Sequence, residues 1–186
     1  MDANTSAAIT LVAPDLERMP HYVDALRRGW SPNNARDVSK EQLALFRESP
    51  ERLLSELTRQ DGTIDIGGGK RVPRLPSRVF WIFDGEFCGT INLRYMPGTE
   101  ALPPYCSGHI GYAIVPWKQR RGYATAALGM VLQVARALGL ARVQVTCDTI
   151  NDASRKVILA NGGKFAGIQQ SKELDQPAKL VFWIAT

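Results

Sequence analysis

The segment Val115–Thr125, VPWKQRRGYAT, decides the fold of this chain. The stretch before it, Gly108–Val115 (GHIGYAIV), is typical of a central strand, and the stretch after it, Tyr123–Leu138, carries apolar residues at helical spacing. A strand therefore runs into a short basic loop that opens directly into a helix. Because backbone N–H groups and the helix dipole attract anions at a helix N-terminus, the pattern predicts a phosphate-binding loop.

The residues inside this loop suit that interpretation. Gly122 allows close approach of the backbone, the small Ala124 leaves room beside it, and Arg120 and Arg121 add positive charge. The loop is not a P-loop, because no GK[ST] follows, and it lacks the GxGxxG of a dinucleotide turn. A basic turn that merely precedes an amphipathic helix is the alternative.

Length and composition indicate the class of protein that contains this loop. The chain has 186 residues, a net charge of +5, 45% hydrophobic and 22% charged residues, which predicts one globular domain. Its 3 cysteines show no CxxC spacing, which argues against a disulfide framework and a thiolate zinc site. No apolar run approaches the roughly 20 residues of a membrane span, and no secretory signal pattern is evident. We therefore expect a cytoplasmic protein without a membrane segment or a bound metal.

The remaining segments alternate between strand and helix patterns. Further strands are predicted at Ala8–Ala13, Arg78–Asp84, Phe87–Arg94, Arg142–Cys147, Lys164–Gln170 and Leu180–Ile184. Further helices are predicted from Pro14 to Gly29 with a break at Pro20, in two segments between Ser39 and Leu57 separated near Pro50, and at Asn151–Asn161. Ser39 and Gln42 match a capping box, and Asp61–Ser77 is expected to be a long exposed loop. The order indicates an α/β fold with a mixed, mostly antiparallel central sheet flanked by helices.

Three motifs in this order resemble the GNAT superfamily of N-acetyltransferases. Gln119–Ala124 (QRRGYA) is similar to its [QR]-x-x-G-x-[GA] pyrophosphate loop. Asn151–Ser154 (NDAS) resembles its N-x-x-[AS] signature, and Asn161–Phe165 resembles the glycine turn into the last strands. The resemblance covers about Arg78–Phe165. The sequence of this stretch is also similar to an uncharacterised bacterial branch of predicted acetyltransferases.

The resemblance implies a single acetyltransferase domain over residues 1–186, splayed at the cofactor strand. Residues 1–77 would supply N-terminal helices and a loop on the acceptor side, 78–165 the acetyl-CoA-binding core, and 166–186 the C-terminal strands. The sequence does not identify a role for the basic segment Lys70–Arg78.

The resemblance also implies which residues contact acetyl-CoA, the expected cosubstrate. They are Ile114, Val115, Gln119, Arg120, Arg121, Gly122, Tyr123, Ala124, Thr125, Asn151 and Ser154. The backbone N–H near Val115 would polarise the thioester carbonyl, as an oxyanion donor does. Lys118 would lie near the phosphates together with the two arginines.

The proton-transfer groups are less well defined. Many superfamily members carry a tyrosine acid four residues after the [AS] of the asparagine motif, where this chain has Ile158. His109 is a candidate base, because strand alternation puts it on one face with Gly111, where several members hold a catalytic glutamate. The alternative is a structural histidine that bonds a neighbouring strand.

These features predict an N-acetyltransferase that transfers acetyl directly from acetyl-CoA to a primary amine of a small molecule or peptide. A non-catalytic acyl-CoA-binding or regulatory module is the alternative, kept open by Ile158. Nucleic acid is not an expected partner, because the basic residues lie in no helix-turn-helix or RNA-binding pattern. A homodimer stays open, since two-fold dimers are the commonest assembly.

Overall fold

The computed structural model describes residues 8–34, 36–66, 69–170 and 177–186. The chain divides into two compact units that interleave along the sequence. The first unit comprises Met1–Arg59, Val79–Asn92 and Tyr112–Ala127, and the second comprises Gln60–Arg78, Leu93–Gly111 and Leu128–Thr186. The expected subdivision at residues 77 and 165 is one of function and stays a prediction.

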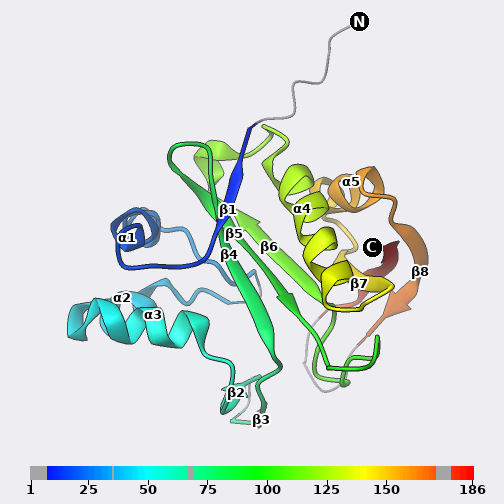
Figure 1. The fold of residues 1–186 in the computed structure, drawn as a ribbon, viewed down its shortest axis with the longest axis horizontal. Helices are drawn as coiled ribbons and strands as arrows, with labels where there is room; N and C mark the ends of the chain where they lie inside the picture. Colours follow the sequence, from blue (N-terminus) through cyan, green and yellow to red (C-terminus); the bar gives the residue numbers. More distant parts are fainter. Residues whose placement is uncertain (1–7, 35, 67–68, 171–176) are drawn as a thin grey trace, which may run out of the picture. The chain divides into compact units, whose positions relative to one another are not determined.

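The elements follow the predicted alternation of helices and strands (Figure 1). In chain order they are β1 (Thr10–Val12), α1 (Met19–Arg27), α2 (Ser39–Glu48), α3 (Pro50–Thr58), β2 (Thr63–Asp65), β3 (Arg71–Pro73), β4 (Ser77–Phe83), β5 (Phe87–Arg94), β6 (Ile110–Ile114), the 3-10 turn η1 (Pro116–Lys118), α4 (Tyr123–Ala137), β7 (Arg142–Asp148), α5 (Asp152–Ala160), β8 (Lys164–Gln169) and β9 (Lys179–Ala185).

The strands form three sheets, and the predicted fold class is confirmed. One sheet has the order β1-β4-β5-β6, one pairs β2 with β3, and one has the order β7-β9-β8. The pairs β1–β4, β2–β3, β7–β9 and β8–β9 are antiparallel. The strands β6 and β7 are consecutive in the chain, yet each ends a different sheet.

Two predictions about helix starts are wrong. The first helix begins at Met19 and not near Pro14, so Pro20 lies in its first turn, where its missing N–H is tolerated. The capping box is absent, because the Ser39 N–H donates to Asp37 Oδ1 at 2.8 Å and the Tyr22 hydroxyl donates to Gln42 Oε1 at 2.5 Å.

The expected loop Asp61–Ser77 contains the hairpin of β2 and β3 instead. In this hairpin Arg71 Nε donates to Thr63 Oγ1 at 2.8 Å across the antiparallel pair. Gly67 and Gly68, which stand between the two strands in the sequence, lie outside the described residues. Part of the basic segment is thus held in a small sheet of the second unit.

The first unit has an aromatic core that includes the inner face of β6. Tyr22 stacks on Trp81 with ring centroids 5.1 Å apart, and the Phe87 ring meets both edge-on. Ala113 and Val115 belong to the same buried cluster. Burying each large side chain contributes about 1.5–3 kcal/mol, so this core fixes the end of β6 firmly.

At Gly89 the strands β5 and β6 approach too closely for a side chain. A Cβ at Gly89, whose φ is +148°, would lie 2.2 Å from Ala113 O and 2.9 Å from Ile114 Cα. Beside it, the Val115 N–H donates to Cys88 O at 2.9 Å. A glycine is therefore required where β5 holds the end of β6.

In the second unit, His109 is buried completely. Its Nδ1 accepts the backbone N–H of Gln144 at 2.9 Å, and its ring centroid lies 6.2 Å from that of Trp183. Burial lowers the pKa of His109 below its ordinary value of 6.5, and the nearby Arg94 charge adds to this effect. The folded protein therefore protonates this imidazole less readily than the unfolded chain does.

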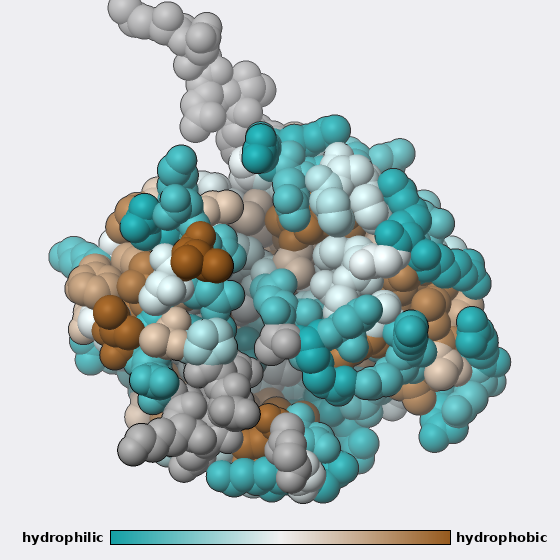
Figure 2. Space-filling view, turned by 180° about the vertical axis from the view of Figure 1, so that it is seen from behind, coloured by the Kyte–Doolittle hydropathy of each residue, from teal (hydrophilic) through white to brown (hydrophobic). Residues whose placement is uncertain are grey.

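The surface of the described residues carries isolated apolar side chains. The exposed large ones are Leu16, Met130, Ile150, Leu159, Phe165 and Ile168. On the face drawn in Figure 2, hydrophobic residues form small separate groups among hydrophilic ones. No helix within the described ranges has the length and apolar character needed to cross a bilayer.

We predict that Gly89→Ala destabilises the fold by about 2–4 kcal/mol, because the methyl group overlaps backbone atoms and the residue has a positive φ. Urea unfolding measures the change. Gly98→Ala is the control, since its φ of +76° is also positive but no atom lies within 4 Å of the added Cβ. Equal losses in the two variants would contradict the close approach.

We also predict that part of the acid sensitivity of the fold depends on His109. The unfolded chain takes up a proton as the pH falls through about 6.5, whereas the folded histidine does so only at lower pH, so stability falls below this pH. In His109→Asn the decrease in melting temperature from pH 7 to pH 5 should be smaller than in the wild type. The exposed His21, replaced by Gln, is the control and should leave the decrease unchanged.

Candidate functional site

The basic loop lies in the first unit and is shaped by left-handed residues. Gln119, Arg120, Arg121 and Gly122 are all exposed. Arg120, with φ of 62°, is the one non-glycine residue with positive φ in the described part of the chain, and Gly122 has φ of 78°. A backbone whose φ changes sign from residue to residue can form a nest, a concave arrangement of N–H groups that suits an anion.

The start of α4 adds further donors to this nest. The first hydrogen bond of the helix runs from the Ala126 N–H to Gly122 O at 3.0 Å. The helix therefore does not use the N–H groups of its first residues, Tyr123 and Ala124. These groups, the helix dipole and the exposed Arg120 and Arg121 are together of the kind that attracts a phosphate or pyrophosphate group.

The edge of β6 leads into this loop and exposes backbone groups. Because the Val115 N–H points to β5, strand alternation points the backbone groups of Tyr112 and Ile114 away from β5. Two side chains bond to this edge: Asn34 Nδ2 donates to Tyr112 O at 2.9 Å, and Gln119 Nε2 donates to Ile114 O at 3.2 Å.

This register shifts the predicted oxyanion donor by one residue. The Val115 N–H is already bonded to Cys88 O, so the geometry does not support the role expected for it. The N–H of Ile114 points to the edge that polar groups can reach. Ile114 is therefore the better donor for the carbonyl of a bound thioester.

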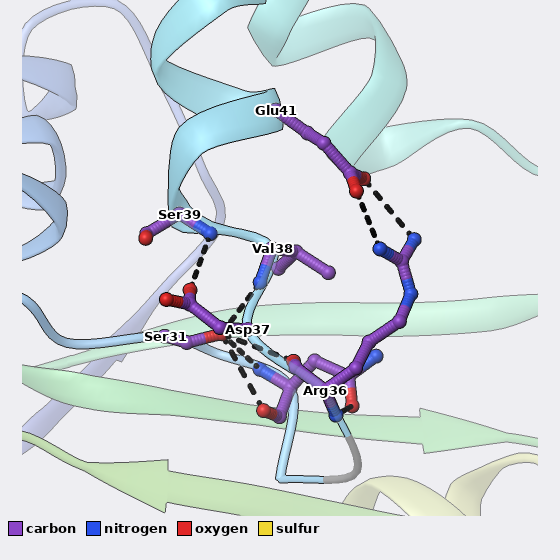
Figure 3. A network of polar contacts seen from close by, with 7 residues as sticks. Ser31, Arg36, Asp37, Val38, Ser39 and Glu41 are labelled. Carbon is purple, nitrogen blue, oxygen red and sulfur yellow. Dashed lines mark hydrogen bonds and ion pairs between the residues drawn. The ribbon is translucent and has the colours of Figure 1, made fainter.

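The loop that carries Asn34 is held by its own polar network (Figure 3). Ser31 Oγ accepts the Val38 N–H at 3.1 Å, and Arg36 binds both carboxylate oxygens of Glu41 at 2.5 and 3.1 Å. The network joins the end of α1 to the start of α2. It therefore gives Asn34 a defined backbone from which to reach β6.

Lys118 and Tyr123 both bind the carboxylate of Asp84, a contact that the sequence did not indicate. Lys118 Nζ lies 3.0 Å from both oxygens of Asp84 and 2.7 Å from Glu86, and the Tyr123 hydroxyl donates to Asp84 at 2.5 Å. The expectation that Lys118 lies among the phosphates is not supported, because two carboxylates neutralise its charge. The loop's positive charge comes from Arg120 and Arg121.

The described geometry does not favour His109 as a base. Its Nδ1 lone pair accepts the Gln144 N–H, so the neutral ring carries its proton on Nε2, which has no hydrogen-bond partner among the described residues. Uptake of a proton would have to break the Nδ1 bond in a buried site. This is the structural histidine that the sequence left as the alternative.

The cysteines and Ile158 supply no acid or nucleophile either. Burial raises the pKa of Cys88 to about 12, with the Asp84 charge adding to it, and burial also raises the pKa of Cys147. Ile158 is buried completely, and its side chain would lie 2.4 Å from a Cβ added at Gly163. It packs in the second unit.

Asn151 and Ser154 lie at the start of α5 in the second unit. The Asn151 Oδ1 accepts the Ser154 N–H at 3.0 Å and so caps the helix. The signature therefore has a structural role within its own unit. The Asn151 amide nitrogen is a separate donor, so the cap leaves the expected cofactor contact as a prediction.

Sequence reasoning missed Asp84 and Asn34, which bond to the loop and to β6. Asp84 stands in the turn Asp84-Gly85-Glu86, and its bond from the Glu86 N–H at 3.1 Å is what any turn aspartate makes. Its additional partners lie far along the chain, so no local pattern indicates them. Asn34 lies in a segment predicted only as a turn.

The model of the acetyltransferase (GNAT) domain matches residues 33–164. No curated protein matches the chain. Among solved structures, the microcin C7 self-immunity acetyltransferase MccE, in complex with acetyl-CoA and AMP, has a TM-score of 0.62 and 15% identity over 96% of this chain and 92% of its own.

Two further solved structures are similar. RimJ of Mycobacterium smegmatis, in complex with CoA-disulfide, has a TM-score of 0.65 and 21% identity over 97% of this chain and 83% of its own. A spermidine N-acetyltransferase SpeG chimera from Vibrio cholerae and hSSAT has a TM-score of 0.60 and 12% identity over 95% of each chain. These likenesses show the fold, and the domain match, which covers most of the sequence, shows that the chain belongs to the GNAT acetyltransferase family.

Proposed function

We propose that this protein is an acetyl-CoA-dependent N-acetyltransferase that acts on a primary amine of a small molecule or peptide. The observation that carries the proposal is the exposed nest Gln119–Gly122 at the start of α4, next to the polar edge of β6. Both features lie in the first unit. Similar structures were solved with acetyl-CoA or CoA-disulfide, which supports the choice of cosubstrate.

The residues present fit such a molecule. The backbone of Arg120–Gly122 and the first N–H groups of α4 would hold the pyrophosphate, with Arg120 and Arg121 supplying charge. The edge of β6 would bond the pantetheine arm at Ile114, once the amide of Gln119 moves aside. When bound, acetyl-CoA supplies a thioester whose acyl carbon an amine can attack.

The Ile114 N–H would donate a hydrogen bond to the thioester carbonyl oxygen and so stabilise its negative charge. It is fixed in a strand that the aromatic core holds, so no reorganisation is needed when negative charge develops on the carbonyl oxygen. No described side chain with a shifted pKa lies ready as a base in the first unit near this edge. We infer that the ammonium gives its proton to a water molecule before the neutral amine attacks, and that CoA leaves as the thiolate without an acid.

The proposal identifies the acceptor by its chemical class. By their names, the proteins in the similar structures acetylate different amines: RimL a ribosomal protein, L7/L12, and SpeG spermidine. The proposal is therefore limited to primary amines. A cytoplasmic location would match the supply of acetyl-CoA and is proposed with it.

The proposal is tested by mixing the purified protein with acetyl-CoA and a panel of polyamines, peptides and amino-acid derivatives. We expect release of CoA thiol, measured with a thiol reagent, that depends on at least one amine. Tight binding of acetyl-CoA in calorimetry without transfer to any amine would favour the non-catalytic module. Failure to bind acetyl-CoA at all would exclude both functions.

Ile114→Pro tests the oxyanion donor. Proline removes the N–H, and it is tolerated because this N–H points away from β5 in an end strand. Loss of one such donor lowers kcat by about 100-fold or more. A melting temperature close to that of the wild type, together with an unchanged kcat, would exclude Ile114 from this role.

A further inference from the structure

A half-buried carboxylate joins the two ends of the basic loop. Asp84 lies just after β4, and it binds Lys118, which immediately precedes Gln119, and Tyr123, which immediately follows Gly122. The distances are 3.0 Å from Lys118 Nζ to each Asp84 oxygen and 2.5 Å from the Tyr123 hydroxyl. All these residues belong to the first unit.

The cluster is shielded from water and fully paired. The side chains of Asp84 and Lys118 are 13% and 10% exposed, whereas that of Glu86, the second partner of Lys118, is 75% exposed. Burial by itself would raise the pKa of Asp84, but the hydrogen bonds from Tyr123, Lys118 and the Glu86 backbone hold it well below its usual range. Asp84 is therefore ionised at neutral pH.

The loop between these two ends has further hydrogen bonds, from Gln119 Nε2 to Ile114 O at 3.2 Å and from the Arg121 guanidinium to Trp117 O at 3.4 Å. Gln119–Gly122 are exposed, and Arg120 adopts the left-handed conformation with φ of 62°. A strained backbone of this kind costs about 1–3 kcal/mol and persists only where its surroundings enforce it. The bonds from Asp84 to both neighbours of the loop supply such enforcement.

We propose that Asp84 is a positioning residue that holds the loop Gln119–Gly122 in its anion-binding shape before acetyl-CoA binds. It acts through Lys118 and Tyr123 and touches neither the cosubstrate nor the reacting atoms. The inference rests on the proposed function, because it names the anion as the pyrophosphate of acetyl-CoA.

Loss of the carboxylate should lower the fraction of molecules whose loop is ready to bind. Without Asp84, the buried Lys118 amino group has only the exposed Glu86 as a partner, and the Tyr123 hydroxyl loses its acceptor. The apparent Kd rises as the competent fraction falls. The chemical step is unchanged once the cosubstrate is bound.

The experiment compares Asp84→Asn with the wild type. We expect the Kd of acetyl-CoA in calorimetry, and its KM, to rise about tenfold, while kcat at saturation stays within about twofold. Tyr123→Phe, which removes one of the two attachments and keeps the ion pair, should shift Kd in the same direction by less. Hydrogen exchange of the Arg120–Gly122 amides in the free protein should become faster in Asp84→Asn.

Glu17→Gln is the matched control. It makes the same change of charge at a side chain that is 84% exposed and should leave Kd unchanged, so a general charge effect is separated from the specific one. An Asp84→Asn protein that binds acetyl-CoA as the wild type does, or that loses kcat with Kd intact, overturns the proposal. If the wild type itself does not bind acetyl-CoA, the proposed function fails. In that case, unchanged hydrogen exchange of the Arg120–Gly122 amides in Asp84→Asn would separately reject Asp84 as the residue that holds the loop.

Discussion

The hydrogen bond from the Val115 N–H to Cys88 O sets the orientation of β6, and the candidate site depends on it. A strand exposes alternate backbone groups on its two edges, so a bond toward β5 at Val115 directs Ile114 the other way. Gly89 permits this pairing because a side chain there would overlap Ala113. The turn at Pro116–Lys118 follows at once, so the same bond also fixes where the anion-binding loop begins.

The parts that the sequence predicted are those with local causes. The loop Gln119–Ala124 and the helix α4 follow from residues that are neighbours in the chain, and both are present as expected. Asp84 and Asn34 reach their partners Lys118 and Tyr112 across 34 and 78 positions. A pattern of residue types along one sequence carries no signal for such pairs, because the folded strands create the proximity.

His109 and Asn151 show a different limit, since the residue types were noticed but their surroundings decide their use. A histidine near neutral pH suits proton transfer, yet burial and the Gln144 N–H tie up its basic nitrogen. The Asn-x-x-Ser pattern of the cofactor signature is equally a helix cap, and Asn151 makes that cap. Strand alternation and motif spacing predict where a side chain lies, whereas its burial and its hydrogen-bond partners decide which reaction or contact it can take part in.

The left-handed Arg120 has a consequence for the speed of cofactor capture. A loop that already has its curled shape needs no ordering when an anion arrives, so encounter is not followed by a slow folding step. Under the proposed function, the association rate then depends on diffusion and on the attraction between the two exposed arginines and the phosphates. That attraction weakens as ionic strength rises, whereas the partly buried Asp84–Lys118 pair that supports the loop is screened much less.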